Sequence, residues 1–158
     1  RPSATSTPRW RMPAEWELHE ATWLAWPHET SDWPGKFTPI PWLYGEIVRH
    51  LARVEKVRIL VENREAESKV RAILAKCHVD LTGVEFFLHP TDRSWTRDFC
   101  PTFVSSVSSV SGGGRLGIPH WKFNGWAKYD NFAADDAAPE FIARALKLRY
   151  THRPSSRS

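Results

Sequence analysis

Short apolar runs alternate with amphipathic stretches along most of the chain. Five β-prone runs predict strands, at residues 21–26, 57–61, 84–88, 101–107 and 116–123. Apolar residues at three- and four-residue steps predict three helices, capped by Thr38, by Asn63 and by Asp135 or Asp136. Strands and helices that interleave in this way are typical of an α/β fold.

Each predicted helix has one apolar face, which we expect to be buried. The first face carries Ile40, Leu43, Ile47, Val48, Leu51 and Val54. The second carries Ala66, Val70, Ile73, Leu74 and Cys77, and the third carries Phe141, Ile142, Ala145 and Leu146.

Three segments lack such a pattern. Residues 1–11 are rich in Pro, Ser, Thr and Arg and predict a disordered leader before a natural start at Met12. Residues 149–158 predict a disordered tail, which leaves residues 12–148 as the folded region. Residues 105–114 are rich in Ser and Gly and predict a flexible hairpin connection.

The totals fit one soluble globular domain, with 158 residues of which 25% are charged and 41% hydrophobic. The net charge of +4 comes from scattered basic residues, so we expect no nucleic-acid partner. Nine Trp are unusual, however, and a surface of Trp and Arg that stacks single-stranded bases is the lowest-ranked alternative. No apolar run approaches the length of about 18 residues that a membrane helix needs.

Residue types that commonly bind metals or cofactors do not occur at the spacings of a known binding motif in this sequence. The seven His and two Cys lack a metal-ligand pattern, and the Gly residues form neither a dinucleotide fingerprint nor a phosphate loop. We therefore expect no metal and no cofactor. Two cysteines without a secretory segment predict reduced thiols in the cytoplasm, with Cys77 on a helix face and Cys100 at the start of a strand.

The strongest functional signal lies in residues 89–98, a polar connection between two apolar runs. Trp95 offers a large flat apolar face, and Asp98 offers a carboxylate three residues later. Such a pair suits a guanidinium, which stacks on the indole and donates parallel N–H bonds to the carboxylate. The structural alternative is that Trp95 fills the core while Arg97 and Asp98 form a solvated pair.

Three sequence blocks resemble a known family. Residues 12–16 (Met-Pro-Ala-Glu-Trp) and 19–27 (His-Glu-Ala-Thr-Trp-Leu-Ala-Trp-Pro) are similar to the opening of agmatine deiminases. Residues 95–98 (Trp-Thr-Arg-Asp) with 101–104 (Pro-Thr-Phe-Val) resemble their substrate-binding segment, and residues 121–124 with Trp126 resemble the next block. Bacterial-type peptidylarginine deiminases share these blocks.

The resemblance implies a fold and a reaction. The fold is a five-bladed α/β propeller of ββαβ units, of which this chain would supply about the first two blades. The reaction converts agmatine and water to N-carbamoylputrescine and ammonia, a step toward putrescine. A Cys thiolate attacks the guanidinium carbon, a His moves protons, and two carboxylates hold the nitrogens. Asp98 matches the first of these carboxylates, and Trp95 matches the aromatic residue that lines the pocket.

The chain also departs from the family pattern. The nucleophilic Cys and the His-x-Asp pair are expected beyond Ser158, so we expect the chain to be inactive alone. His78 and Asp80 have the right letters but stand out of family order. Cys100 stands where the family usually has Gly and is interpreted as structural, and Phe99 replaces a small or polar residue. Arg97 is interpreted as a structural partner within the loop.

Three further hypotheses stay open beside the agmatine deiminase fragment. The chain could derive from a protein-arginine deiminase, because the same blocks serve both substrates. It could be a non-catalytic module that binds guanidines or polyamines. Single-stranded nucleic-acid binding ranks last. The sequence predicts no oligomeric state.

Overall fold

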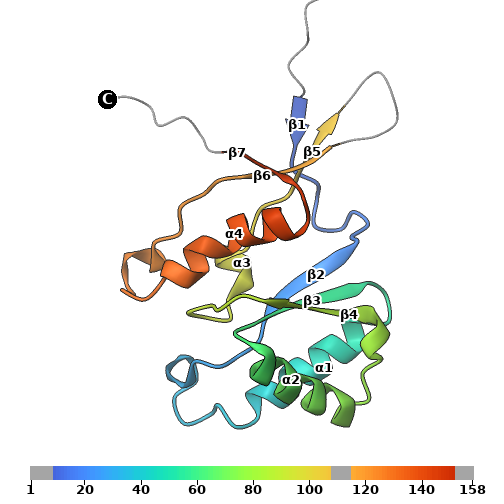
Figure 1. Cartoon of the computed structure of the whole chain (residues 1–158), viewed down its shortest axis with the longest axis vertical. Helices are drawn as coiled ribbons and strands as arrows, with labels where there is room; N and C mark the ends of the chain where they lie inside the picture. Colours follow the sequence, from blue (N-terminus) through green and yellow to red (C-terminus); the bar gives the residue numbers. More distant parts are fainter. Residues whose placement is uncertain (1–8, 108–114, 152–158) are drawn as a thin grey trace, which may run out of the picture. The chain divides into compact units, whose positions relative to one another are not determined.

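The computed structural model describes residues 9–107 and 115–151, which are coloured in Figure 1. The strands are β1 (Arg9–Arg11), β2 (Ala21–Ala25), β3 (Lys56–Val61), β4 (Val84–Leu88), β5 (Val104–Val107), β6 (Leu116–Pro119) and β7 (Arg149–Thr151). The α-helices are α1 (Ile40–Leu51), α2 (Arg64–Lys76), α3 (Thr96–Phe99) and α4 (Ala133–Ala145). Short 3-10 helices are η1 (Thr30–Asp32), η2 (Leu81–Gly83) and η3 (Gly125–Ala127). Strands and helices interleave, as predicted.

The chain divides into two compact units. The three-stranded unit comprises Leu18–Cys100 and Lys122–Ala138 and contains the sheet β2-β3-β4. The four-stranded unit comprises Arg1–Glu17, Pro101–Trp121 and Pro139–Ser158 and contains the sheet β1-β5-β6-β7. Neither unit is therefore one continuous segment of the chain.

In the three-stranded unit, β2, β3 and β4 run parallel, with Ala21 opposite Lys56 and Val57 opposite Val84. Parallel neighbours need a crossover connection, and here α1 links β2 to β3 while α2 links β3 to β4. Both helices lie on the same face of the sheet (Figure 1). The carboxyl ends of the three strands consequently share one edge, from which the loops after β2 and β4 emerge.

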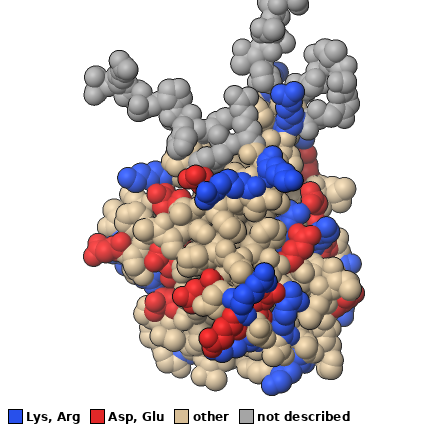
Figure 2. All heavy atoms as spheres, viewed as in Figure 1, with Lys and Arg blue, Asp and Glu red and all other residues tan. Residues whose placement is uncertain are grey.

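Charged side chains of both signs are intermixed on the face drawn in Figure 2. Charged residues of α1 and α2 form pairs about one helical turn apart: Arg49 contacts Glu46 at 2.7 Å, and Lys69 contacts Glu65 at 2.7 Å. Exposed pairs of this kind add little to stability. They do offset the basic residues locally, as the scattered charge pattern predicts.

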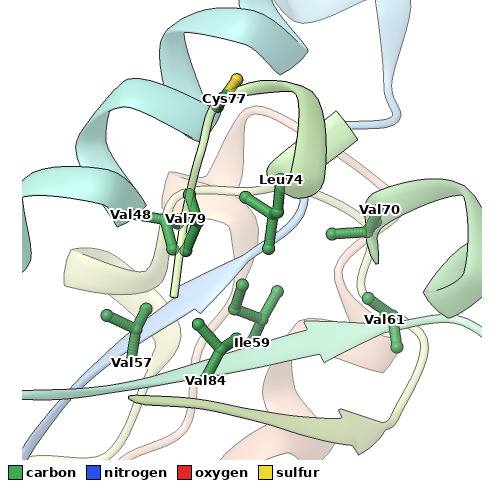
Figure 3. Packing of buried hydrophobic residues seen from close by; sticks show 9 residues of the cluster. All are labelled: Val48, Val57, Ile59, Val61, Val70, Leu74, Cys77, Val79 and Val84. Carbon is green, nitrogen blue, oxygen red and sulfur yellow. The ribbon is translucent and has the colours of Figure 1, made fainter. Parts of the chain in front are cut away.

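The core of this unit lies between the sheet and the helices (Figure 3). Alternate residues of β3 point toward the helices, and they pack against Val48 of α1 and against Val70 and Leu74 of α2. The cluster shown consists of Val48, Val57, Ile59, Val61, Val70, Leu74, Cys77, Val79 and Val84. The apolar run of β3 is buried along its whole length after Lys56, and the helical period in α2 buries the positions that the sequence predicts.

The other face of the sheet carries Arg58, which is 8% exposed. Its guanidinium lies 2.6 Å from a Glu20 oxygen and 2.7 Å from a Glu85 oxygen, and it stacks over Trp23 at 5.7 Å. The α3 turn packs near this face, where the Thr96 hydroxyl donates to the Trp23 carbonyl at 3.3 Å. This face of the sheet thereby supports the α3 turn.

The four-stranded unit pairs β1 with β5 and β5 with β6 in antiparallel fashion, and β6 with β7 in parallel. The predicted hairpin between β5 and β6 is confirmed. The predicted absence of structure is wrong for Arg9–Arg11 and Arg149–Thr151, since both are strands. Backbone pairing stabilises them despite their polar sequences. The rest of the predicted leader, tail and hairpin connection falls on 1–8, 152–158 and 108–114, outside the described residues.

The structure confirms one of the predicted helix starts described here and corrects another, together with part of one predicted helix face. The Asn63 cap is confirmed, because its side chain accepts a hydrogen bond from the Ala66 N–H at 2.9 Å. The Thr38 cap is wrong: α1 starts after Pro39 without a side-chain cap. The predicted face of α1 is also partly wrong, since Leu43 is 55% exposed while Val48 is buried. Among the described helices, none is long and apolar enough to cross a membrane.

Candidate functional site

The predicted site follows β4, at the carboxyl edge of the parallel sheet, where α/β sheets commonly bind ligands. Residues 89–95 leave the strand as a loop, and Thr96–Phe99 form the single turn of α3. The sequence predicts an irregular connection here and a strand from residue 101, whereas β5 starts only at Val104. A four-residue helix has no periodicity of its own, so local sequence does not reveal it.

The α3 turn brings the two predicted substrate-binding residues together. Trp95 is the residue before the first turn, and the Asp98 N–H donates to the Trp95 carbonyl at 3.0 Å. Trp95 is half-buried and Asp98 is exposed. Within the part of the chain that the structure describes, the Asp98 carboxylate has no hydrogen-bond or ion-pair partner. This carboxylate can therefore accept bonds from a ligand.

Aromatic rings extend the surface that Trp95 begins. The Trp95 ring lies 5.1 Å from the Trp126 ring and 6.4 Å from the Tyr129 ring, measured between centroids. Phe123 meets Trp126 edge-on at 5.0 Å. The two polar-aromatic segments of the sequence, around residues 95 and 126, thus form one aromatic wall. We refer to Trp95, Phe123, Trp126 and Tyr129 as the aromatic wall.

The turn that carries Trp126 has an unusual backbone. Gly125, Trp126 and Ala127 have φ angles of 58°, 57° and 54°, in the left-handed region. This region costs a residue with a Cβ about 1–2 kcal/mol. Strained backbone of this kind persists where surrounding contacts fix it, and it often occurs at functional sites. Here it presents the Trp126 ring, 42% exposed, beside Trp95.

Arg93 is a buried anchor that the sequence does not reveal. Its guanidinium pairs with the Asp32 carboxylate, donates to Asn131 Oδ1 at 3.0 Å and to Ser31 Oγ at 3.4 Å. It also stacks on the Tyr129 ring at 4.3 Å. Arg93 therefore ties the site loop to the loop after β2 and to the segment after η3. Its partners are distant in sequence, which leaves no local signal.

Asp92 and Asp135 exchange hydrogen bonds between the site loop and α4. The N–H groups of Asp92 and Arg93 donate to Asp135 Oδ1 at 2.7 and 3.3 Å. In return, the N–H groups of Ala134 and Asp135 donate to Asp92 Oδ2 at 2.8 and 3.4 Å. This reciprocal pair fixes the loop against the start of the helix. Burial raises the pKa of Asp135 to about 6, although the two amide bonds oppose the shift.

These contacts correct the predicted cap of the last helix. α4 begins at Ala133, so Asp135 and Asp136 lie within its first turn instead of capping it. The Asp92 carboxylate accepts from the free amides at the helix start, and Asp136 instead accepts from the Phe123 N–H at 2.7 Å. Acidic residues are favoured both at caps and in first turns, so the sequence does not separate the two.

Neither cysteine has the surroundings of an activated nucleophile. Cys100 ends α3 instead of starting a strand as predicted, and desolvation together with the nearby Asp135 carboxylate raises its pKa. Cys77 lies buried in the core, and desolvation raises its pKa as well. Catalytic thiols require a lowered pKa. The structural interpretation of Cys100 therefore has physical support.

The His78-Val79-Asp80 sequence has a structural explanation. Asp80 accepts from the Thr82 N–H at 3.0 Å and from its hydroxyl at 2.7 Å, which caps η2. These bonds lower the pKa of Asp80. Among the described residues, no group of three or more His, Cys, Asp or Glu is arranged to hold a metal ion.

Comparison with known sequences identifies relatives. Residues 11–156 match the sequence model of the Porphyromonas-type peptidyl-arginine deiminase family. The chain is 30% identical over 154 residues to the agmatine deiminase of Stutzerimonas stutzeri (strain A1501), with 94% of this chain and 39% of the relative covered. It is 31% identical over 129 residues to the agmatine deiminase of Pseudomonas aeruginosa (strain LESB58), with 80% and 32% covered.

Solved structures share the fold. The agmatine deiminase of Enterococcus faecalis superimposes with a TM-score of 0.75 at 19% identity, over 92% of this chain and 38% of that one. A variant of the C. jejuni agmatine deiminase with substrate bound gives a TM-score of 0.75 at 23% identity, over 97% and 42%. These likenesses show the α/β fold, as predicted.

The chain spans 32–39% of the length of the two curated relatives. The family match nevertheless covers nearly all of this chain, including both segments of the aromatic wall. The chain therefore belongs to the Porphyromonas-type peptidyl-arginine deiminase family.

Proposed function

We propose that this chain is the guanidinium-binding part of an agmatine deiminase, an enzyme that hydrolyses agmatine to N-carbamoylputrescine and ammonia. Both curated relatives described above are named agmatine deiminase. The observation that carries the proposal is the exposed Asp98 carboxylate, which has no partner among the described residues and belongs to the helical turn that follows Trp95 of the aromatic wall. The two predicted site residues, Trp95 and Asp98, are its core.

An exposed carboxylate and an indole on one short turn suit a planar cation. A guanidinium can donate two parallel N–H bonds to the Asp98 carboxylate while one face lies on an indole. Removing part of the cation from water against the aromatic wall strengthens both interactions. Arg93 is itself held by this combination of a carboxylate, Asp32, and an aromatic face, Tyr129.

We propose that the two units form about two blades of a five-bladed α/β propeller. The fraction of the solved agmatine deiminase chains that this chain covers, 38% and 42%, is close to two fifths. Each sheet of the described residues is open, as separate blades require. The remaining blades would complete the pocket around Asp98.

Hydrolysis needs an activated thiolate in addition to the cation site. Cys77 and Cys100 do not supply it, since desolvation raises the pKa of both. We therefore propose that residues 1–158 bind agmatine but release no ammonia from it. Ammonia release above that of the Asp98→Ala variant would contradict this part of the proposal.

Calorimetric titration of the 158-residue chain with agmatine tests the binding site. We expect saturable binding that weakens at least about tenfold in Asp98→Asn, which keeps the shape of the side chain and removes its charge. Glu140→Gln is a matched control, because Glu140 is an exposed carboxylate on α4. Equal affinity in native chain and Asp98→Asn would refute the site.

A protein-arginine deiminase is the second candidate, and the description of the family supports it. The two candidates differ in what surrounds the guanidinium: free agmatine carries an amine, and a peptide carries backbone amides. Titration with N-acetyl-arginine amide separates them. Tighter binding of this ligand than of agmatine would favour the protein substrate.

Two binding functions without chemistry remain as alternatives. A guanidine- or polyamine-binding module predicts the same agmatine titration, and putrescine, which lacks the guanidinium, distinguishes polyamine binding. Single-stranded nucleic-acid binding predicts affinity that falls steeply with salt. The intermixed charges on the face in Figure 2 argue against a continuous basic path.

A further inference from the structure

Asp135 is not one of the proposed guanidinium-binding residues, but its surroundings are unusual in three ways. It is fully buried, with 0% of its surface exposed. One carboxylate oxygen, Oδ1, accepts two backbone bonds from the site loop. The other oxygen, Oδ2, is buried and has no hydrogen-bond partner among the described residues. A buried half-satisfied carboxylate is costly, so a role for it is expected.

We propose that Asp135 is a positioning residue: it holds the loop that carries Trp95 and Asp98, and it makes guanidinium binding by that loop sensitive to pH. The inference rests on the proposed guanidinium-binding function. Asp135 binds the loop at the amides of Asp92 and Arg93, and Arg93 precedes Trp95 by two residues. The Asp135 side chain is fully buried, so its effect on a ligand would run through the loop.

The loop is held from both ends. On one side, Asp135 accepts from the Asp92 and Arg93 amides, and Asp92 accepts from α4 in return. On the other side, the Thr96 hydroxyl donates to the Trp23 carbonyl on β2. Trp95 lies between these two attachments, and Asp98 lies one helical turn beyond it. Loss of the first attachment therefore loosens the start of the segment that carries the site, although the Arg93 side chain still ties it to Asp32.

Charge controls the strength of that attachment. The two amide bonds favour the ionised carboxylate, but the cost of burying its charge is larger, so the site as a whole opposes ionisation. Burial raises the pKa of Asp135 to about 6, so the carboxylate is mostly ionised above that pH and mostly neutral below it. Release of the loop would return this carboxyl to water, where its pKa is ordinary, so ionisation favours release. We thus expect the loop to be held firmly below about pH 6 and loosened as the pH rises through this value.

Other ionisable and charged groups surround Asp135. The negative charge of Asp92 raises its pKa, and the positive form of His28 lowers it. The Cys100 thiol faces it from α3. The remaining charged or ionisable neighbours on the adjoining segments are Arg93, His89 and Asp136. Histidine is the side chain whose charge ordinarily changes in this pH range, so the experiment must separate the effect of Asp135 from that of its histidine neighbours.

Agmatine titrations of the full 158-residue chain between about pH 5 and about pH 8 provide the test. For the native chain we expect affinity to fall about tenfold from the low to the high end, because ionisation of the buried Asp135 opposes the attached state of the loop. In Asp135→Asn, which is neutral throughout, affinity should stay near the native low-pH value at every pH. A native-like pH profile in Asp135→Asn would assign the effect to the histidines and overturn the inference.

A second measurement needs no variant. The amide resonances of Asp92 and Arg93 in the ¹⁵N-labelled native chain should shift with a midpoint near the Asp135 pKa of about 6. Resonances that stay constant through this range would overturn the positioning role. If the native chain binds no agmatine at any pH, the proposed function fails, and the resonances still decide whether Asp135 holds the loop.

Discussion

Gly45 on α1 faces Cys77 at the end of α2 so closely that a methyl group on Gly45 would lie 2.5 Å from the Cys77 sulfur. Carbon and sulfur do not approach to this distance, so the two helices pack here only because residue 45 lacks a side chain. The contact also fixes which side of α1 is buried, since Gly45 and Val48 are its buried residues.

Gly45→Ala should destabilise the chain by about 1–3 kcal/mol through overpacking, although alanine is the better helix former. In a Cys77→Ala background the same change should cost much less, because the nearest remaining atom, the Cβ of residue 77, lies at 3.3 Å. Urea unfolding of the native chain, the two single variants and the double variant gives the four stabilities of a double-mutant cycle. Equal costs in both backgrounds would rule out the sulfur contact as the cause.

Arg93→Met should cost about 3–5 kcal/mol, because it leaves the buried Asp32 carboxylate without its cation. Asp32→Asn combined with Arg93→Met should recover part of this loss, since no buried charge remains. Chemical denaturation measures both variants. A double variant less stable than Arg93→Met would mean that the Asp32 charge has another stabilising partner.

The raised pKa of Asp135 predicts a pH-dependent stability. Its folded value of about 6 lies above the ordinary 3.8, so the folded state binds the proton more tightly and ionisation opposes folding. The contribution of this carboxyl is greatest at low pH and is lost as the pH rises toward and through about 6. Between about pH 4.5 and 7.5, the stability of Asp135→Asn relative to the native chain should improve by about 2 kcal/mol. A constant difference would contradict the raised pKa.

Ala127→Gly should stabilise the chain by about 0.5–1 kcal/mol, because glycine adopts the φ of 54° without strain. Ala137→Gly is the matched control: Ala137 is exposed within α4, where glycine should cost about 1 kcal/mol. Thermal unfolding compares the two. Destabilisation by Ala127→Gly would show that the left-handed turn is not strained at this residue.

Both thiols should react slowly in the folded chain. Desolvation raises the pKa of Cys77 and of Cys100, which lowers the thiolate fraction, and Cys77 is buried. Reaction with a chromogenic disulfide at about pH 8 should be slow until denaturant is added, when both should react rapidly. A fast-reacting thiol that maps to Cys100 would reopen a chemical role for it.

The sequence predicts those features that depend on local periodicity. The continuous apolar run of β3, the apolar face of α2 and the Asn63 cap are all set by neighbouring residues, and the structure confirms them. Trp95 and Asp98 are three residues apart, so local sequence places them in one short segment, although it does not reveal the helical turn that they share. Their function in binding stays a prediction.

Contacts between residues that are distant in the sequence cannot be predicted from local patterns. Arg93 and Asp32 are 61 residues apart, and Asp92 and Asp135 are 43 apart, so nothing in the local pattern marks them as partners. The exposed Leu43 has a similar origin. An amphipathic pattern allows several rotations of a helix, and the close approach at Gly45 selects the one observed.

The chain passes back and forth between its two units, and this limits which shortened proteins can contain the whole site. The two segments that build the aromatic wall, around residues 95 and 126, belong to one unit, yet residues 101–121 between them belong to the other. Shortening the chain from either end therefore cannot remove residues 101–121 while it keeps both segments of the aromatic wall. A single cut between them would separate the two segments into different fragments. A minimal binding protein would require residue 100 to be joined to residue 122 by a short linker, and the shorter loop would lower the entropic cost of bringing the two halves together.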